Sequence, residues 1–256
     1  ADVGIAMGGG HSEIAGSVAD VVADDDKLAT LIDAIAQGRT IYANIRKSIH
    51  YLLSTNFSEI EMMLAGLALG MPQPLTPMQL LWINLVTDVF PALALALEAP
   101  ESDVLARPPR DPGEPVVTPG DLRRMLAESA VITTSALGVY GIGLSRYGPG
   151  PRAGTLAFTT LTAAQLAHAY VCRREKSAGG RAGNWRLDVA VGGSLALQGL
   201  ALLFPPTRRL LGAARPGLGD LALTAAGAIL PMIINRRIRS APREGPALSG
   251  DEEKSA

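Results

Sequence analysis

The sequence predicts a mainly α-helical fold, a six-helix transmembrane bundle that follows a short α/β segment. Hydrophobic residues make up 48% of the 256 residues, and the 18% that are charged gather mostly in the gaps between long apolar runs. Each run is close to the roughly 20 residues that a helix needs to cross the hydrocarbon core of a bilayer. We therefore expect an integral membrane protein with the lipid bilayer as a partner.

The first 37 residues have the character of a soluble α/β unit. An apolar strand from Val3 to Met7 is followed by a glycine turn at 8–10, a helix capped by Ser12 with Glu13 in its first turn, and a second strand in DVVADD. The chain opens on this strand without an initiator methionine or a preceding turn, so we expect it to start partway through a domain.

One long helix is predicted to join this unit to the membrane. From Leu28, apolar residues at helical spacing continue through GRTIYANIRKSIHYLL into the first apolar run, with Arg46 and Lys47 at the boundary. Such a helix is a stiff rod that can transmit movement, although a simple juxtamembrane anchor would have the same sequence pattern.

Six spans are predicted at 48–69, 75–97, 123–145, 154–172, 187–204 and 219–235. With the N-terminal unit in the cytoplasm, most basic residues near the spans are also cytoplasmic. The ones that would face outward are Arg146, Arg152, Arg208, Arg209 and Arg215. This bias predicts that both termini are cytoplasmic.

The organisation that follows has five parts. They are the α/β unit (1–37), the connecting helix with the first two spans (38–97), a cytoplasmic loop (98–122), four further spans (123–240) and a disordered tail (241–256).

The second apolar run contains polar groups, which are costly inside a membrane unless they have a partner. Asn84, Thr87, Asp88 and Pro91 fall within about 100° of one another on a helix, so they share one face. Pro91 cannot donate a backbone hydrogen bond, which leaves the Thr87 carbonyl free beside the Asp88 carboxylate. Oxygens around a half-broken helix suit a desolvated cation. We interpret this stretch as half of an ion site; interhelical hydrogen bonding is the alternative.

Charge and cysteine content exclude other classes of site. The chain has 23 basic and 24 acidic residues, so no overall positive field indicates a nucleic-acid partner. Cys172 is the only cysteine, and a single cysteine predicts neither a disulfide nor a cysteine metal site.

Several stretches resemble the C-terminal portion of P-type cation-transporting ATPases, in particular the calcium-pump-like subgroup. They are ADVGIAMG, DDKL, GRTIYANIRKSIHYLLSTNFSE, PMQLLWINLVTDVFPALALALE and RPPRDPGEP, with a weaker match in LLFPPTRRLLGAARPGLGDL. The resemblance covers essentially the whole chain and is most specific between Gly38 and Pro115.

The resemblance implies that residues 1–37 are the end of a haloacid-dehalogenase-like phosphorylation domain and that the spans are the last six of ten. The phosphorylated aspartate, the nucleotide-binding domain and the actuator domain would lie upstream, so ATP and Mg²⁺ would act only through those partner domains. We expect no ATP hydrolysis by this chain alone. The implied location is a bacterial plasma membrane.

The same resemblance implies which residues bind the transported cation, Ca²⁺ or another divalent ion. Asn56 and Glu59, at i and i+3 in the first span, resemble family ligands, as do Asn84, Thr87 and Asp88 in the second. These groups offer the oxygens that hard cations prefer.

Gln165 in the fourth span stands where two-site calcium pumps usually have glutamate. The amide can still ligate, but one negative charge is lost, which favours a single ion or a different metal. Thr162 and His168 share this face, and a lone histidine is more often packed or hydrogen-bonded than a ligand.

Two further acids in the spans are assigned no part in the cation site. Glu61 lies about 160° from Glu59, so we expect it to pair with a neighbouring span, with a part in proton movement as the alternative. Glu128 is near a span end and is predicted to have no special function.

Two other function classes stay open. The chain would be a non-catalytic membrane binding or regulatory module if it acts without the upstream domains. A passive channel is weaker, because its acids are placed beside a helix break and are not spread as a ring along a pore.

Overall fold

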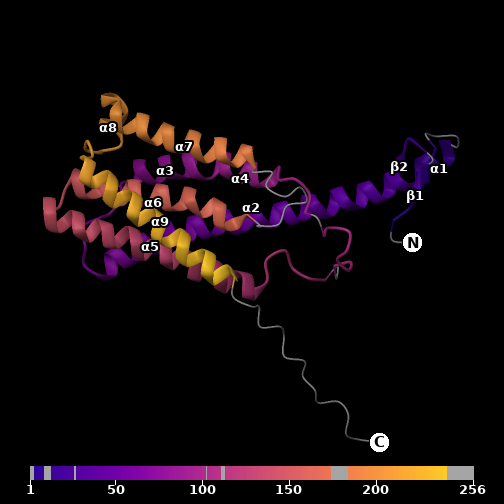
Figure 1. Ribbon diagram of the computed structural model, residues 1–256, viewed down its shortest axis with the longest axis horizontal. Helices are drawn as coiled ribbons and strands as arrows, with labels where there is room; N and C mark the ends of the chain where they lie inside the picture. The colour runs from indigo at the N-terminus through magenta and orange to yellow at the C-terminus, as the bar shows by residue number, and fades with distance from the viewer. Residues whose placement is uncertain are drawn as a thin grey trace, which may run out of the picture.

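The fold is described from a computed structural model that covers residues 3–8, 13–25, 27–101, 103–110, 113–173 and 184–240. Its elements in chain order (Figure 1) are β1 (Ile5–Met7), α1 (Glu13–Val18), β2 (Val21–Ala23), α2 (Leu28–Ala68), α3 (Pro77–Thr87), α4 (Val89–Ala96), α5 (Pro119–Tyr147), α6 (Pro151–Cys172), α7 (Trp185–Leu203), α8 (Pro205–Leu210) and α9 (Leu218–Ser240). The predicted mainly α-helical fold is confirmed. The Ser12 cap and the tail at 241–256 lie outside the described residues.

The N-terminal unit contains the two predicted strands joined by α1. They pair in parallel, with Ile5 opposite Val21, and the Asp20 carboxylate accepts a hydrogen bond of 2.8 Å from the Gly4 amide. Ile5 and Val22 are each about half exposed, at 49% and 48%. A parallel pair normally has both faces covered, so this unit presents apolar surface that its own residues do not bury.

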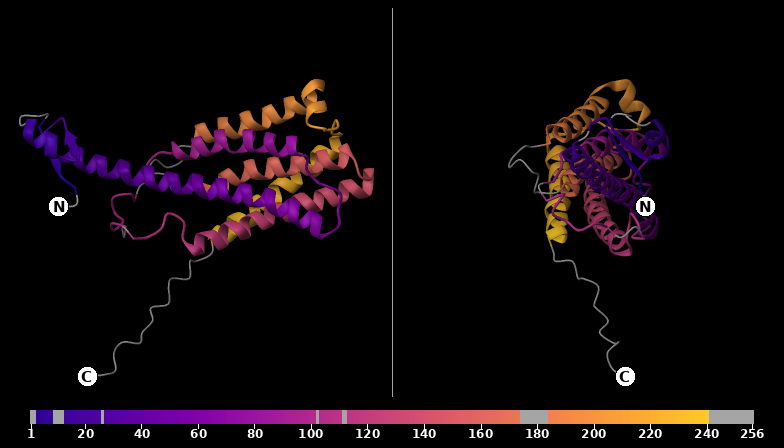
Figure 2. Two further views of the ribbon diagram at one scale, coloured as in Figure 1. Left: turned by 180° about the vertical axis from the view of Figure 1, so that it is seen from behind. Right: turned by 90° about the vertical axis from the view of Figure 1, so that its right-hand side faces the viewer.

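The connecting helix α2 is a single helix of 41 residues, as predicted. At 1.5 Å per residue it is about 60 Å long. Figure 2 shows that its first half projects beyond the other helices, with β1, α1 and β2 at its far end. Apolar side chains on this projecting half, such as Ile32 and Ile35, are exposed.

Helices α2, α3, α4, α5, α7 and α9 all contact α6, and α3 and α4 run in the same direction (Figure 1). The main partners of α6 are α5 and α9, with α2 and α7 alongside, and α5 also packs on α2 and α9. Most α6 side chains are buried, including Phe158 and Leu161 in the apolar core. The hydroxyls of Thr155, Thr159 and Thr162 each donate to the carbonyl four residues earlier, which satisfies these polar groups inside the helix.

Four segments within the described residues are long and apolar enough to cross a membrane: Pro77–Ala96, Pro119–Tyr147, Trp185–Leu203 and Leu218–Arg239. They coincide with four of the predicted spans. The other two predicted spans lie in α2 and α6, which are helical but more polar. Because α6 is surrounded by protein, its threonines and amides are shielded from lipid. The count of six crossings stays a prediction.

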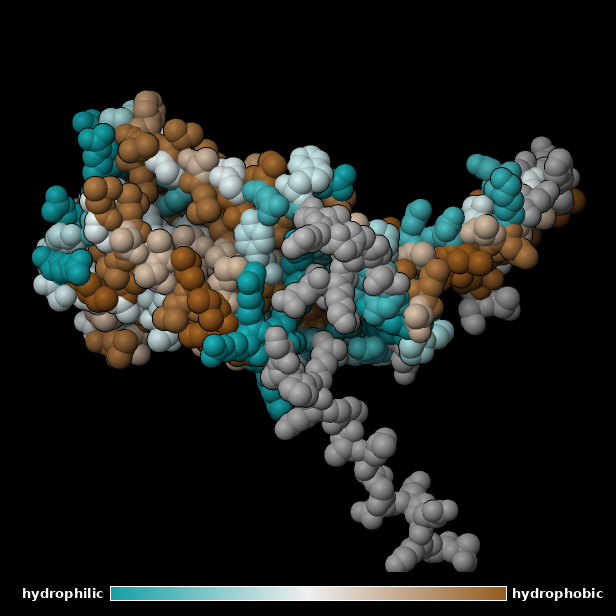
Figure 3. All heavy atoms as spheres, viewed as in Figure 1, coloured by the Kyte–Doolittle hydropathy of each residue, from teal (hydrophilic) through white to brown (hydrophobic). Residues whose placement is uncertain are grey.

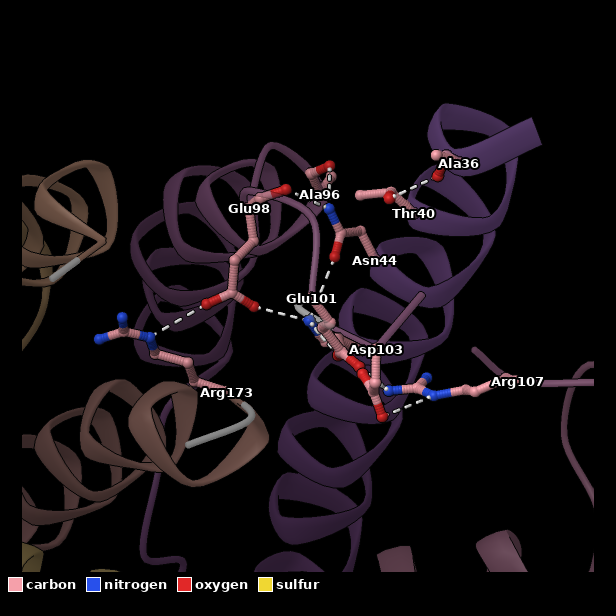
Figure 4. A network of polar contacts seen from close by, with 10 residues as sticks. Ala36, Thr40, Asn44, Ala96, Glu98, Glu101, Asp103, Arg107 and Arg173 are labelled. Atoms are coloured by element: carbon pink, nitrogen blue, oxygen red, sulfur yellow. Dashed lines mark hydrogen bonds and ion pairs between the residues drawn. The ribbon is translucent and has the colours of Figure 1, made fainter. Parts of the chain in front are cut away.

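Surface hydropathy agrees with an integral membrane protein. Figure 3 shows hydrophobic residues over much of the bundle and hydrophilic residues gathered where α2 leaves it. A polar network is buried at this hydrophilic end (Figure 4).

The network joins α2 to the loop after α4 and to the end of α6. Lys47 Nζ lies 2.8 Å from Glu98 Oε2 and 3.1 Å from Glu101 Oε1. Arg173 Nε pairs with the other Glu98 oxygen at 3.0 Å, and Arg107 pairs with Glu101. The loop predicted at 98–122 is therefore attached to both helices by ion pairs, which are strong where they are buried and multiply bonded.

Gly227 lies where α9 packs tightly against α5 and α6. A Cβ at this position would lie 2.7 Å from Thr160 Cγ2 and 2.8 Å from Val139 Cγ2, and both methyls belong to stiff β-branched side chains. We expect Gly227→Ala to destabilise the bundle by about 1–3 kcal/mol. Thermal unfolding in detergent measures the effect. Gly192→Ala is the control, because nothing lies within 4 Å of its Cβ; equal destabilisation by both variants would contradict the close packing.

Candidate cation site

The second predicted span is interrupted at Asp88. Helix α3 ends at Thr87 and α4 begins at Val89, with Asp88 as the residue between them. Pro91 is buried in α4 and has no N–H to give, so the Thr87 carbonyl has no partner four residues later. The predicted half-broken helix is confirmed. The Thr87 carbonyl is not left without a hydrogen bond, however, because the Tyr51 hydroxyl of α2 donates one to it at 2.8 Å.

The Asp88 carboxylate lies against α2. Its Oδ2 accepts from Asn56 Nδ2 at 3.3 Å, while Oδ1 accepts from the hydroxyls of Thr87 at 3.2 Å and Thr55 at 3.5 Å. Thr87 is fully buried and also donates to the Ile83 carbonyl. One carboxylate is thus surrounded by short polar side chains from two helices, as expected for a charge held inside an apolar bundle.

The Glu59 carboxylate bridges three helices. Asn84 Nδ2 of α3 donates to Oε2 at 3.2 Å, and Gln165 Nε2 of α6 donates to Oε1 at 3.2 Å. Glu59 is 7% exposed and Gln165 is fully buried. Gln165 Nε2 also lies 3.0 Å from the Thr55 carbonyl, which connects the surroundings of Glu59 to those of Asp88.

All six residues predicted from the sequence therefore meet in one polar network, formed by α2, the α3/α4 break and α6. Three α2 residues of this network, Tyr51, Thr55 and Ser58, were missed in the sequence analysis. The Ser58 hydroxyl accepts a hydrogen bond of 3.1 Å from Gln165 Nε2. Their spacing is the signal that could have found them, because positions 51, 55 and 58 lie on one face of the helix. Together these groups offer carboxylate, amide and hydroxyl oxygens, the chemistry of a hard cation site.

The network includes a buried amide oxygen, Gln165 Oε1, that no hydrogen bond reaches from any described residue. A buried unpaired carbonyl oxygen is costly, and a polar ligand would satisfy it.

Residues 72–240 match the family described as "Cation transporting ATPase, C-terminus". The chain belongs to this family. It is 38% identical over 242 residues to a calcium-transporting ATPase of Bacillus subtilis, covering 91% of this chain and 27% of that protein. Calcium-transporting ATPase 1 of Schizosaccharomyces pombe is 32% identical over 88% of this chain, and that of Bacillus cereus is 32% identical over 95%. The chain spans 26% and 29% of those two proteins.

Glu61 of this cation ATPase domain faces away from the site. Its two carboxylate oxygens accept hydrogen bonds from Ser129 at 2.7 Å and from Thr133 at 3.1 Å, both on α5. The predicted pairing with a neighbouring span is confirmed. Glu59 and Glu61 are thus acids of the same helix with different partners.

Glu128 was expected near a span end without special function, but its side chain lies inside the bundle and does not reach the interface. The residue is fully buried, with its Oε2 at 2.6 Å from His50 Nε2 and 3.3 Å from His168 Nε2. Arg124 Nε binds the other oxygen at 3.1 Å. Helix α5 begins at Pro119, more than two turns earlier, and its packing on α2 and α6 turns Glu128 inward.

The expectation that a single cysteine gives no cysteine metal site considered cysteines alone. In the fold, one ligand atom from each of Cys172, His50 and His168 lies within 4.8 Å of the others. His168 was expected to be a packed or hydrogen-bonded residue; it is 1% exposed and lies between Glu128 and Asn235.

Proposed function

We propose that this chain is the membrane part of an ATP-driven cation pump and that it binds and translocates a divalent cation, Ca²⁺ before others. The observation that carries the proposal is the pair of carboxylates, Glu59 and Asp88, in one polar network at a break in a membrane helix. The printed names of the relatives, calcium-transporting ATPases, support the choice of ion.

The cation would replace hydrogen bonds that now hold the carboxylates. Asn56 and Asn84 each donate an amide N–H to a carboxylate, at 3.3 and 3.2 Å. Rotation of each amide would exchange this donor for its carbonyl oxygen, so that amide and carboxylate bind the same ion. The Thr87 hydroxyl is already 3.2 Å from Asp88 and would complete this side of the site.

Gln165 would be a lesser ligand. Its Nε2 lies 3.2 Å from Glu59 Oε1. A glutamate at this position would add a third negative charge to the site, whereas the glutamine amide is neutral. Two carboxylates balance one divalent ion, and a second divalent ion would leave an uncompensated positive charge in a low-dielectric bundle. We therefore propose one ion per transport cycle.

ATP and Mg²⁺ would act through phosphorylation, nucleotide-binding and actuator domains of the same pump. The long helix α2 supports this, because it carries Glu59 at one end and begins beside the N-terminal strands at the other. The exposed apolar side chains of those strands and of the projecting half of α2 would pack on such domains. In this arrangement the N-terminal unit and the C-terminus face the cytoplasm of a bacterium, and the bundle lies in the plasma membrane.

Direct Ca²⁺ binding tests the site. The purified chain in lipid nanodiscs is expected to bind Ca²⁺ in equilibrium dialysis. Asp88→Asn and Glu59→Gln should each weaken binding about tenfold or more, because each removes a charged ligand. Glu61→Gln is the matched control, since it neutralises an acid of the same helix whose carboxylate accepts hydrogen bonds from Ser129 and Thr133 of α5. Equal loss in all three variants would contradict the assignment.

ATP-driven transport distinguishes a pump from a non-catalytic module. In a chimera, this chain replaces the matching segment of the Bacillus subtilis relative, and uptake of radioactive Ca²⁺ into inverted vesicles is measured. We expect ATP-dependent uptake that Asp88→Asn abolishes and Glu61→Gln retains. Ca²⁺ binding by the chimera without ATP-dependent uptake would favour the non-catalytic function.

Gln165→Glu tests the proposed stoichiometry. An added carboxylate beside Glu59 should raise the Ca²⁺ bound per chain, or raise affinity about tenfold, if charge at this position limits the site. Dialysis with radioactive Ca²⁺ measures both quantities. Gln198→Glu is the control, because Gln198 lies on α7 and accepts its hydrogen bond from Trp82. Unchanged affinity and stoichiometry in Gln165→Glu would count against the single-ion proposal.

A further inference from the structure

A second buried cluster of ligand-type side chains lies between α2, α5 and α6. It consists of His50, Glu128, His168 and Cys172, which we call the histidine–cysteine cluster. One ligand atom from each of His50, His168 and Cys172 lies within 4.8 Å of the others. All four residues are buried, with His50 the most exposed at 8%. None of them belongs to the proposed cation site.

The geometry of Glu128 joins the two histidines. The same oxygen, Oε2, lies 2.6 Å from His50 Nε2 and 3.3 Å from His168 Nε2, while Arg124 binds the other oxygen. His168 Nε2 is buried, and the Glu128 carboxylate is its partner at 3.3 Å. On the other side of the ring, Nδ1 lies 3.5 Å from the Asn235 amide nitrogen. The Nε2 atoms of the two histidines therefore face the same carboxylate oxygen.

Two imidazoles, a thiol and a carboxylate select a particular class of ion. Nitrogen and sulfur ligands in a tetrahedral set of four are typical of Zn²⁺, whereas Ca²⁺ and Mg²⁺ prefer oxygen alone. A thiolate would add a negative charge to that of the Glu128 carboxylate, whose other oxygen pairs with Arg124. Neighbouring groups that orient ligands support a metal site, and Arg124 and Asn235 are placed to do this for Glu128 and His168.

We propose that the histidine–cysteine cluster is a binding site for a Zn²⁺-class transition metal, separate from the proposed cation site. Binding at neutral pH would release the Cys172 thiol proton as the thiolate forms its bond to the metal. Cys172 is seven residues from Gln165 on α6, about 10 Å along the helix axis. The bound metal would fasten α2, α5 and α6 to one another and so restrain movement of the helices that carry Glu59 and Gln165.

Cobalt spectroscopy tests this proposal on the purified chain in nanodiscs. Because Cys172 is the only cysteine, thiolate-to-cobalt absorption can arise from no other residue. We expect about one Co²⁺ per chain, with this absorption and tetrahedral d–d bands, both lost on adding Zn²⁺. Absence of the sulfur band in the folded chain would overturn the proposal.

Variants assign the other ligands. Cys172→Ser should remove the sulfur band, and His50→Gln and His168→Gln should each weaken Co²⁺ binding roughly tenfold or more. His11→Gln controls for the remaining histidine of the chain. A sulfur band that persists unchanged in the double variant of His50 and His168 would contradict the site. Where a variant fails to fold, protection of Cys172 from alkylation by Zn²⁺ in the unmodified chain decides instead, and lack of protection overturns the proposal.

The two sites are tested independently. Asp88→Asn should leave the Co²⁺ spectrum unchanged, and Cys172→Ser should leave Ca²⁺ binding unchanged. Loss of the Co²⁺ spectrum in Asp88→Asn would show that the two sites are one and would overturn the separate metal site, whatever the outcome for Ca²⁺.

Discussion

The carboxylates of Glu59 and Asp88 lie inside a membrane bundle, and the residues around them are arranged to stabilise their charge. An acid in such a place needs hydrogen-bond donors or a cation, because neither lipid nor apolar side chains compensate its charge. Glu59 and Asp88 find their donors on three different segments: α2, the α3/α4 break and α6. The break at Asp88 is stabilised in a similar way. Pro91 leaves the Thr87 carbonyl without a helical partner, and the Tyr51 hydroxyl donates a hydrogen bond to it.

This requirement also explains the place of α6 and α2 in the bundle. These helices carry polar residues toward the network and are less apolar than the four segments suited to contact lipid. Helix α6 is enclosed by its neighbours, so Gln165 and the threonines around it are shielded. Helix α2 continues out of the bundle, and the buried pairs of Lys47 with Glu98 and Glu101 hold it against the loop after α4 (Figure 4). Displacement of α2 would therefore act on Glu59 and on this loop together.

The bundle holds two polar clusters with different chemistry. In the cluster at Glu59 and Asp88, the proposed ligand atoms are all oxygens. The histidine–cysteine cluster combines imidazole nitrogen, thiol sulfur and one carboxylate. Hard cations and Zn²⁺-class ions differ in which of these sets they prefer. Both clusters use α2 and α6, so the two proposed sites share helices while they select different ions.

By itself the sequence determined the helices, the strands and the ligands of the proposed cation site. Apolar runs of membrane length, the two strand segments and the break beside Pro91 are local features. The proposed ligands Asn56, Glu59, Asn84, Thr87 and Asp88 follow from helical spacing and from family resemblance. Only the tertiary structure decided which distant residues meet. Glu128, His50, His168 and Cys172 come from three different helices, and no local pattern specifies how those helices are rotated toward one another. Their contact depends on side-chain packing between helices, which is a property of the folded bundle.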